Sequence, residues 1–396
     1  MTLLYRFETL IAPIALSAFL NRYYESEPLR LSRSDPGFYA GLLTMEGLEA
    51  WLNTGVARYP DVLLVQHETD IGRSEFADPN GKIDPERLFR RFEQGATIVV
   101  NNLERHLPEL AALCRGAEKL FSMPFQTNIY LSPPNAQGFR THYDTHDVFV
   151  LQAAGSKEWR LYDNKIVLPL PGQGFDKERD IPGVQTDAFT LETGDLLYCP
   201  RGLMHDARST DQPSLHITFG LLGKTRTELI IEAVAAACLA EPELHRTLTP
   251  GYANEGFDRT ALRETLAALL RRIADTGADL DKALDGMAEN FLASRQPPMR
   301  GHLAERLAPP PLGLTDRLAV RSDLIWRFGN EAETLQLQVP GTTIDLPAFT
   351  REALTFMLTE PAFAVADIPG PIDDDARIVL ANRFMREGLL TRVTGA

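Results

Sequence analysis

Residues 128–162 read NIYLSPPNAQGFRTHYDTHDVFVLQAAGSKEWRLY, and this stretch decides the fold. Short β-branched and aromatic runs alternate here with the turn-forming clusters PPNAQG and AAGS. The same pattern fills residues 121–222, where PLPGQG, ETGD and CPRG supply further turns. Many short strands with a turn every ten or so residues indicate an antiparallel barrel or sandwich, with a pocket at its mouth. The predicted strands are Thr127–Leu131, Val148–Gln152, Lys157–Tyr162, Ala188–Leu191, Asp195–Tyr198 and Leu215–Leu221.

Two candidate metal ligands, His142 and Asp144, lie inside this stretch. Side chains at positions i and i+2 of a strand point to the same side, so the two can converge on one ion. His205 follows 61 residues after Asp144, beyond a predicted strand and the turn CPRG, which would place it at the start of a neighbouring strand. Two histidines and one carboxylate form the facial triad that binds non-haem Fe(II) and leaves coordination positions open. A closed zinc site is disfavoured, because no cysteine has ligand spacing from these residues.

His146 falls on the same predicted face as the two candidate ligands. Along a strand, however, about 13 Å separates positions 142 and 146, too far for both histidines to share an ion unless the strand bends. We therefore expect His146 to face the substrate or to line the pocket. An isolated H-x-D is common by chance, but the β-rich context and the later histidine favour a metal site over that interpretation.

The composition indicates a globular protein of two or three domains, since 396 residues exceed one ordinary core. Hydrophobic residues make up 44% and charged residues 24%, and no apolar run is long enough to span a bilayer. The three cysteines, which are far apart, and the lack of a signal-peptide pattern predict a cytoplasmic location. The formal charge of −14 disfavours direct binding of nucleic acid and favours a basic partner.

Outside the β-rich region, helical spacing and capping signals dominate. A Pro-rich linker is expected where Gln296-Pro-Pro and Ala308-Pro-Pro-Pro stand. The predicted helices are Ser17–Tyr24, Thr44–Leu52, Asp84–Glu93, Thr227–Leu239, Thr260–Thr276, Asp279–Leu292, Leu346–Leu358 and Ala376–Glu387. Further strands are predicted at Ala96–Val100, Thr334–Val339 and Leu389–Val393.

Together these segments resemble the ribosomal oxygenases, JmjC-type hydroxylases that modify histidine or arginine residues of ribosomal proteins. The resemblance is carried by residues 128–162, by GDLLYCPRGLMH at 194–205, by SLHIT at 214–218 and by RYYESEPLRLSR at 22–33. It implies an α+β fold built on a double-stranded β-helix, the cupin or JmjC jelly-roll barrel. The implied domains are a catalytic domain with an N-terminal helical-strand extension (1–225), a helical dimerisation region (226–305) and a winged-helix-like C-terminal domain (306–396).

Carried over residue by residue, the resemblance makes His142, Asp144 and His205 the iron ligands. It makes Lys157 the cation that pairs with the distal carboxylate of 2-oxoglutarate, and an inward lysine would indeed be costly without an anionic partner. The alternative for Lys157 is a solvated residue beside the AAGS turn. Three more residues match polar positions of the cosubstrate pocket: Asn128, Tyr130 and Thr218.

The residues expected near the substrate are Arg140, His146 and His216. Arg140 and the Thr145-His146 pair depart from the family pattern, so they leave the substrate more open than the iron chemistry. The implied cofactors are Fe(II), 2-oxoglutarate and O₂, and the implied activity is a dioxygenase that hydroxylates a His or Arg side chain of a ribosomal protein. The implied assembly is a homodimer.

Three alternatives stay open. The same chemistry could act on another peptide or on a small metabolite. The chain could instead be a non-catalytic cupin scaffold or regulator that uses its C-terminal module. Residues 312–396 carry 12 acidic and 8 basic residues, however, and a DNA-reading winged helix is normally basic. The third alternative is a metal-bearing cupin of another activity, such as an isomerase. Lys157 beside a full triad favours the oxygenase over the scaffold and over the isomerase.

Overall fold

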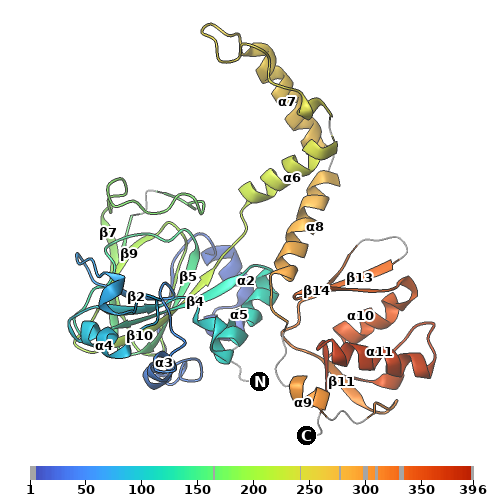
Figure 1. The fold of residues 1–396 in the computed structure, drawn as a ribbon, viewed down its shortest axis with the longest axis horizontal. Coiled ribbons are helices and arrows are strands. Elements are labelled where there is room, and N and C mark those ends of the chain that lie inside the picture. The colour runs from blue at the N-terminus through green and yellow to red at the C-terminus, as the bar shows by residue number, and fades with distance from the viewer. Residues whose placement is uncertain are drawn as a thin grey trace. The chain divides into compact units, whose positions relative to one another are not determined.

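The computed structural model describes residues 6–163, 166–240, 242–275, 278–297, 302–307, 311–329 and 334–393. The chain divides into two units, Met1–Gly223 and Lys224–Ala396, and each is described by itself (Figure 1). Thr276 lies outside the described residues, and so do Pro298 and Ala308–Pro310 of the expected Pro-rich linker. None of the described helices combines the length and the apolar composition that crossing a membrane requires.

The described residues of the first unit form two antiparallel sheets. In the part of the unit that the structure describes, one sheet has the strand order β1 (Leu29–Leu31), β8 (Leu196–Cys199), β5 (Asp147–Ala154), β10 (Ser214–Leu221), β4 (Phe125–Ser132), β3 (Thr97–Val100) and β2 (Val62–Val65). The other has the order β7 (Gln185–Leu191), β6 (Lys157–Tyr162) and β9 (Met204–Ser209). The antiparallel barrel or sandwich is thereby confirmed, and every predicted strand of 121–222 is present.

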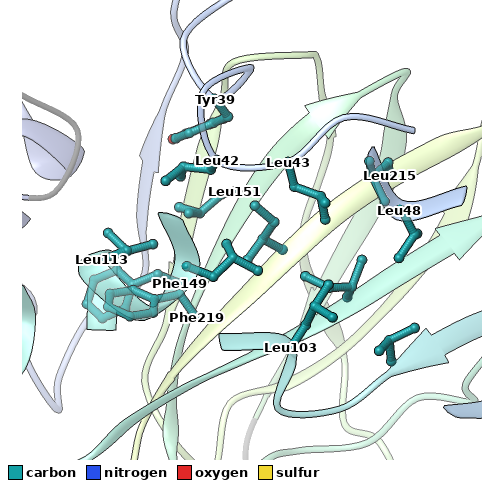
Figure 2. Packing of buried hydrophobic residues seen from close by; sticks show 14 of the residues in the cluster. Tyr39, Leu42, Leu43, Leu48, Leu103, Leu113, Phe149, Leu151, Leu215 and Phe219 are labelled. Carbon is teal, nitrogen blue, oxygen red and sulfur yellow. The ribbon is translucent and has the colours of Figure 1, made fainter. Parts of the chain in front are cut away.

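The side chains of β5 alternate between two cores. Phe149 and Leu151 point to the outer core, where Figure 2 shows them with leucines of the N-terminal region such as Leu48. Val148 and Val150 point the other way and pack in the second core, which includes residues of β6 and β7. Because successive residues of a strand face opposite sides, this sheet carries the helices on one face and the barrel lumen on the other.

Helices of the N-terminal region cover the outer face, and their buried side chains share one core with the sheet. The bounds are α1 (Phe7–Ile11), α2 (Leu16–Ala18), α3 (Met45–Leu52), α4 (Pro85–Glu93) and α5 (Pro108–Phe121). The predicted caps are confirmed, because the side chain of Thr44 accepts from Gly47 N–H and that of Asp84 from Arg87 N–H.

The helix predicted at Ser17–Tyr24 is only partly α-helical. It starts as α2 and continues as a π-helix over Phe19–Tyr23. The tertiary packing accounts for this difference from the helix expected on spacing alone, since the Phe19 ring is fully buried against Tyr198, with ring centroids 5.1 Å apart.

The second unit begins with three helices, α6 (Arg226–Ala240), α7 (Thr260–Asp275) and α8 (Ala278–Ala293), of which α6 packs on α8. After the short α9 (His302–Leu307) a C-terminal module follows, with its own core. Its described elements are β11 (Arg317–Val320), β12 (Arg327–Phe328), β13 (Thr334–Val339), β14 (Thr342–Pro347), α10 (Arg351–Thr359), β15 (Phe363–Ala364), α11 (Asp374–Arg386) and β16 (Leu390–Arg392).

The predicted start of the helix at Leu346 is wrong. Residues Thr342–Pro347 form β14 and pair with β13 across a turn at Gly341, whose φ of 77° suits glycine. The apolar residues Ile344 and Leu346 alternate with exposed positions, as a half-buried strand requires. The helix therefore begins only at Arg351.

Candidate metal centre

The two segments that carry the candidate ligands run antiparallel beside each other. His142 N–H donates to the carbonyl oxygen of His205 (3.0 Å), and His205 N–H donates to that of His142 (2.8 Å). On one side of this pair, Thr141 Oγ1 donates to Asp206 Oδ2 (2.7 Å). On the other side, Gly202 N–H donates to the carbonyl oxygen of Asp144 (2.9 Å). These bonds fix the position of the first two ligands relative to the third.

The prediction that His142 and Asp144 lie on a regular strand is wrong. His142 makes an isolated bridge with His205, between the end of β4 and the start of β5. A regular antiparallel ladder would next pair Asp144 with Leu203. The Asp144 carbonyl oxygen instead accepts from Gly202 N–H, in the turn before His205, so the register shifts by one residue. The expected position of His205, at the start of a neighbouring strand, is correct, since β9 begins at Met204.

The three candidate ligands converge on one point. One ligand atom from each of His142, Asp144 and His205 can be chosen so that all lie within 4.8 Å of one another. His205 Nε2 lies 3.7 Å from Asp144 Oδ2. Nδ1 of His142 is 2.8 Å from the Arg140 carbonyl oxygen, and Nδ1 of His205 is 3.0 Å from that of Leu203. A proton on each Nδ1 would satisfy these bonds and leave each Nε2 lone pair free for a metal.

The protonation states at this point suit a divalent cation. Burial raises the pKa of Asp144, but the neighbouring imidazoles of His142, His205 and His146 outweigh it, so that the pKa is lowered. Burial, followed by the proximity of His142, lowers the pKa of His205. At neutral pH the site therefore offers a carboxylate and a neutral imidazole, the forms that bind metals. Two imidazoles and one carboxylate with no thiolate among them fit Fe(II) with open positions.

A cavity of about 130 Å³ adjoins the three ligands inside the barrel. It brings together every predicted site residue except Arg140, which is exposed and contributes its carbonyl oxygen to His142. The other lining residues are Thr97, Asn128, Tyr130, Gly138, Phe139, His146, Val148, Val150, Lys157, Trp159, Ala207, His216 and Thr218. Asn128 and Tyr130 reach it from alternate positions of β4, as the strand period predicts.

Lys157 points into the barrel, so the solvated alternative is wrong. Its side chain is buried with a residue exposure of 5%, and Nζ donates to Ser132 Oγ (3.1 Å). Ser132 Oγ also bonds to Thr97 Oγ1 (2.9 Å). Burial lowers the pKa of Lys157 to about 7, and no carboxylate in the described ranges pairs with it. The lysine is therefore a buried cation site that an anionic ligand would complete.

Sequence reasoning missed Ser132 and Thr97. Ser132 follows Asn128 and Tyr130 on the same face of β4, so extending the alternation by one step would have found it. Thr97 comes from β3, whose four residues are all buried, and nothing in that run marks the threonine as different from its apolar neighbours.

Unpaired ring nitrogens also face this region. The rings of Tyr130 and His216 stack, with centroids 4.8 Å apart and an interplanar angle of 9°. His216 Nδ1 and His146 Nε2 are buried and have no hydrogen-bond partner within the described chain. Burial, then Lys157 and His205, lowers the pKa of His216 well below its usual value. Buried ring nitrogens without a partner can form hydrogen bonds to a ligand that enters the cavity.

Comparison with known proteins connects this site to a known domain. Residues 103–229 match the family model of the JmjC domain. The bifunctional lysine-specific demethylase and histidyl-hydroxylase NO66 of Drosophila persimilis is 29% identical over 305 residues, which cover 73% of this chain and 44% of the fly protein. Ribosomal oxygenase 2 of Bos taurus is 28% identical over 340 residues, which cover 82% of this chain and 72% of the bovine protein. The chain thus spans less than half of the fly relative.

Solved structures show the same fold. The ribosomal oxygenase YcfD from Escherichia coli, in complex with cobalt and 2-oxoglutarate, aligns with a TM-score of 0.53. The alignment covers 96% of this chain and 99% of that one at 17% identity. The observed architecture is accordingly a JmjC cupin fold with mixed helices and sheets. The chain therefore carries a JmjC domain and is similar in sequence to a protein named ribosomal oxygenase 2.

Proposed function

We propose that this chain is an Fe(II)- and 2-oxoglutarate-dependent oxygenase that hydroxylates a His or Arg side chain of a ribosomal protein. The observation that carries the proposal is the combination of His142, Asp144 and His205 with a buried lysine in the same cavity. When bound, iron and 2-oxoglutarate would supply the oxidation of a C–H bond by O₂, with release of succinate and CO₂. The chain's own residues would bind, orient and shield these groups.

In this proposal His142, Asp144 and His205 hold the iron. Lys157 and Ser132 hold the distal carboxylate of 2-oxoglutarate, since Nζ and Oγ are both inside the barrel and already 3.1 Å apart. A carboxylate beside Lys157 would restore its positive charge and form a charge-assisted hydrogen bond. The remaining polar contacts would come from Asn128, Tyr130 and Thr218, which line the same cavity.

Other residues would shape the surroundings of the reacting groups. Val148, Val150 and Trp159 form an apolar wall of the cavity and exclude water from it. His146 and His216 offer unpaired nitrogens, so we assign them to the substrate side of the pocket. Arg140 is exposed next to His142 and is assigned to substrate contact at the surface.

The substrate assignment is supported by the relatives and by charge. One relative is named a histidyl-hydroxylase and another a ribosomal oxygenase. The chain carries a formal charge of −14, which would attract a basic ribosomal protein and would repel a nucleic-acid backbone. We therefore propose a protein substrate, a cytoplasmic location and no direct contact with nucleic acid.

We also propose the domain division 1–225, 226–305 and 306–396, with a winged-helix-like last domain and a homodimer formed through the middle region. Exposed apolar side chains on the helices support the dimer, among them Ile230 at 63%, Ile231 at 60% and Leu239 at 85% exposure. Such residues on a helix surface favour burial against another chain.

The double substitution of Ile230 and Ile231 by Glu is expected to convert the dimer to a monomer without unfolding it. Light scattering after size-exclusion chromatography would measure the mass of both proteins, and circular dichroism would monitor their folding. The substitution Val56→Glu, at a residue 50% exposed in the other unit, serves as the control. A wild-type protein that is monomeric at all concentrations would contradict the assembly.

The activity itself is tested by succinate formation from 2-oxoglutarate with protein loaded anaerobically with iron. Fractions of ribosomal proteins, other proteins and small molecules would be added separately. We expect stimulation by ribosomal proteins, with an added oxygen on His or Arg located by mass spectrometry. His142→Ala should abolish turnover, whereas His67→Ala, outside the cavity, should not.

Stimulation by small molecules alone would replace the protein substrate with a metabolite. A wild-type protein without turnover in any fraction, and without retained iron, would refute the oxygenase and favour a scaffold.

A further inference from the structure

The two ligand-bearing segments, 141–147 and 199–206, are joined at their far end by an ion pair. Arg201 Nη1 donates to Asp147 Oδ2 (3.1 Å). Arg201 stands directly before Gly202, whose N–H holds the Asp144 carbonyl oxygen. Asp147 follows Asp144 by three residues and begins β5. The ion pair thus connects the turn that precedes His205 to the segment that carries the other two ligands.

This ion pair joins a buried carboxylate to a partly buried guanidinium and has additional partners. The side-chain exposure is 13% for Arg201 and 2% for Asp147. The hydroxyl of Tyr198 donates to Asp147 Oδ1 (2.6 Å), so the carboxylate is bonded at both oxygens. Burying two charges costs desolvation free energy that their attraction barely offsets, so such a pair is weak evidence for stability alone. Its effect here is to fix where two chain segments lie.

The same guanidinium reaches the N-terminal region. Arg201 Nη1 also donates to the carboxylate of Glu25, and Glu25 N–H donates to the Tyr198 hydroxyl (2.8 Å). Glu25 lies well before residues 103–229, the range that matches the JmjC domain. A residue outside the matched domain is therefore bonded directly to the turn behind the metal ligands.

We propose that Arg201 is a positioning residue for the metal centre and that Glu25 completes its anchorage. Without the ion pair, the turn at 199–202 would be free to move relative to Asp144, and the carboxylate and the His205 ring would no longer be held in register. The ligands themselves would stay intact, so the loss would appear as weaker and altered metal coordination. The inference rests on the metal site of the proposed function, but its measurement needs no turnover.

The experiment is a titration of the 396-residue chain with Co(II), followed through the visible absorption of the bound metal. Outer partners of metal ligands typically contribute about 10- to 100-fold to metal affinity, so we expect Arg201→Met to weaken Co(II) binding by roughly that factor. Its absorption spectrum should also change. Glu25→Ala should weaken binding by a smaller factor, and Arg201→Lys should lie closer to wild type, because an ammonium group can still donate to both carboxylates.

Arg33→Met is the matched control. Arg33 also anchors the N-terminal region, through Nη1 to the Gly194 carbonyl oxygen (3.3 Å) and the Tyr39 hydroxyl (3.1 Å), and none of these residues lines the cavity. This substitution should lower Tm without changing Co(II) affinity. A purely structural role of Arg201 would give the same result as Arg33.

Arg201→Met leaves Asp147 without its cation and could unfold the protein. Two other variants do not leave the Asp147 carboxylate unpaired and keep the inference testable. Glu25→Ala retains the ion pair between Arg201 and Asp147, and the double variant Arg201→Met/Asp147→Asn removes both charges. Folded variants with wild-type affinity and spectrum would overturn it. Wild-type protein that binds Co(II) but forms no succinate would refute the proposed function alone, whereas wild-type protein that binds no Co(II) would overturn the metal site and this inference.

Discussion

The buried ammonium of Lys157 predicts that cosubstrate binding depends on pH. Its pKa in the free protein is lowered to about 7 from the usual 10.5, because burial disfavours the charge. A carboxylate beside Nζ would stabilise the charged form and raise the pKa again. Binding of 2-oxoglutarate therefore takes up a proton at every pH between the free and the bound pKa. Over that range its affinity should fall as the pH rises.

The size of the effect follows from the protonated fraction of Lys157. With a pKa of about 7, roughly half of the side chains carry a proton at about pH 7 and about one in a hundred at about pH 9. The dissociation constant of 2-oxoglutarate should thus increase about 50-fold between these two values, or roughly tenfold per unit at the alkaline end. The pKa values of His205 and His216 are lowered below the usual 6.5, so their titration ends below this window.

Isothermal titration of the Co(II)-loaded protein with 2-oxoglutarate would measure both the affinity and the proton uptake. Two buffers of different ionisation enthalpy at about pH 8 should reveal an uptake close to one proton per site. Lys157→Arg stays charged and should bind with little pH dependence. Lys157→Met should bind weakly at every pH. Wild-type affinity that is constant over the same window, without proton uptake, would refute the assignment of Lys157 to the cosubstrate carboxylate.

In the protein without cosubstrate, Lys157→Met should raise the free energy of unfolding at about pH 6.5 by about 1–4 kcal/mol, as removal of a buried unpaired charge does. The pKa of Lys157 is lower in the folded than in the unfolded protein, so its buried charge destabilises the fold fully below about pH 7 and progressively less towards pH 10.5. Urea unfolding at both pH values should therefore show that the stabilisation by Lys157→Met becomes smaller as the pH rises. Gly202→Ala should lower Tm and weaken Co(II) binding. Gly202 has a φ of 85°, and a Cβ there would lie 2.3 Å from the Ile166 carbonyl oxygen, at a cost above about 2 kcal/mol. Gly172→Ala, with open space around it, should change neither, and equal effects of both substitutions would contradict the role of the turn.

The strands of the barrel could be predicted because their signals are local. The two-residue period of a strand places Asn128 and Tyr130 together at the cavity, and each turn cluster is visible in the sequence. The same local rule failed at the metal ligands. The backbone of His142 and Asp144 is hydrogen-bonded to residues about 60 positions away, and the bond between Asp144 and Gly202 shifts the register of this pairing.

The residues that could not be predicted are those whose role depends on contacts between segments far apart in the sequence. Thr97 is one of four buried residues in a short strand, and only the fold brings it beside Ser132. Asp147 and Arg201 look like ordinary surface charges in a sequence, because only the fold pairs them across 54 residues and brings Glu25 to the same guanidinium. The pair Thr141–Asp206 is hidden because its two residues lie 65 positions apart in the sequence.

The pairing of segments 141–147 and 199–206 has a consequence for the order of folding. Its hydrogen bonds join residues about 60 positions apart. Closing a loop of that length costs chain entropy, which is compensated only after the strands between the two segments have formed. The metal centre is thus a late event, absent from partly folded chains. An ion that binds only the completed protein shifts the folding equilibrium by about 1.4 kcal/mol for each tenfold excess over its dissociation constant. Metal supply during synthesis would then determine how much of the newly made chain persists in the native state.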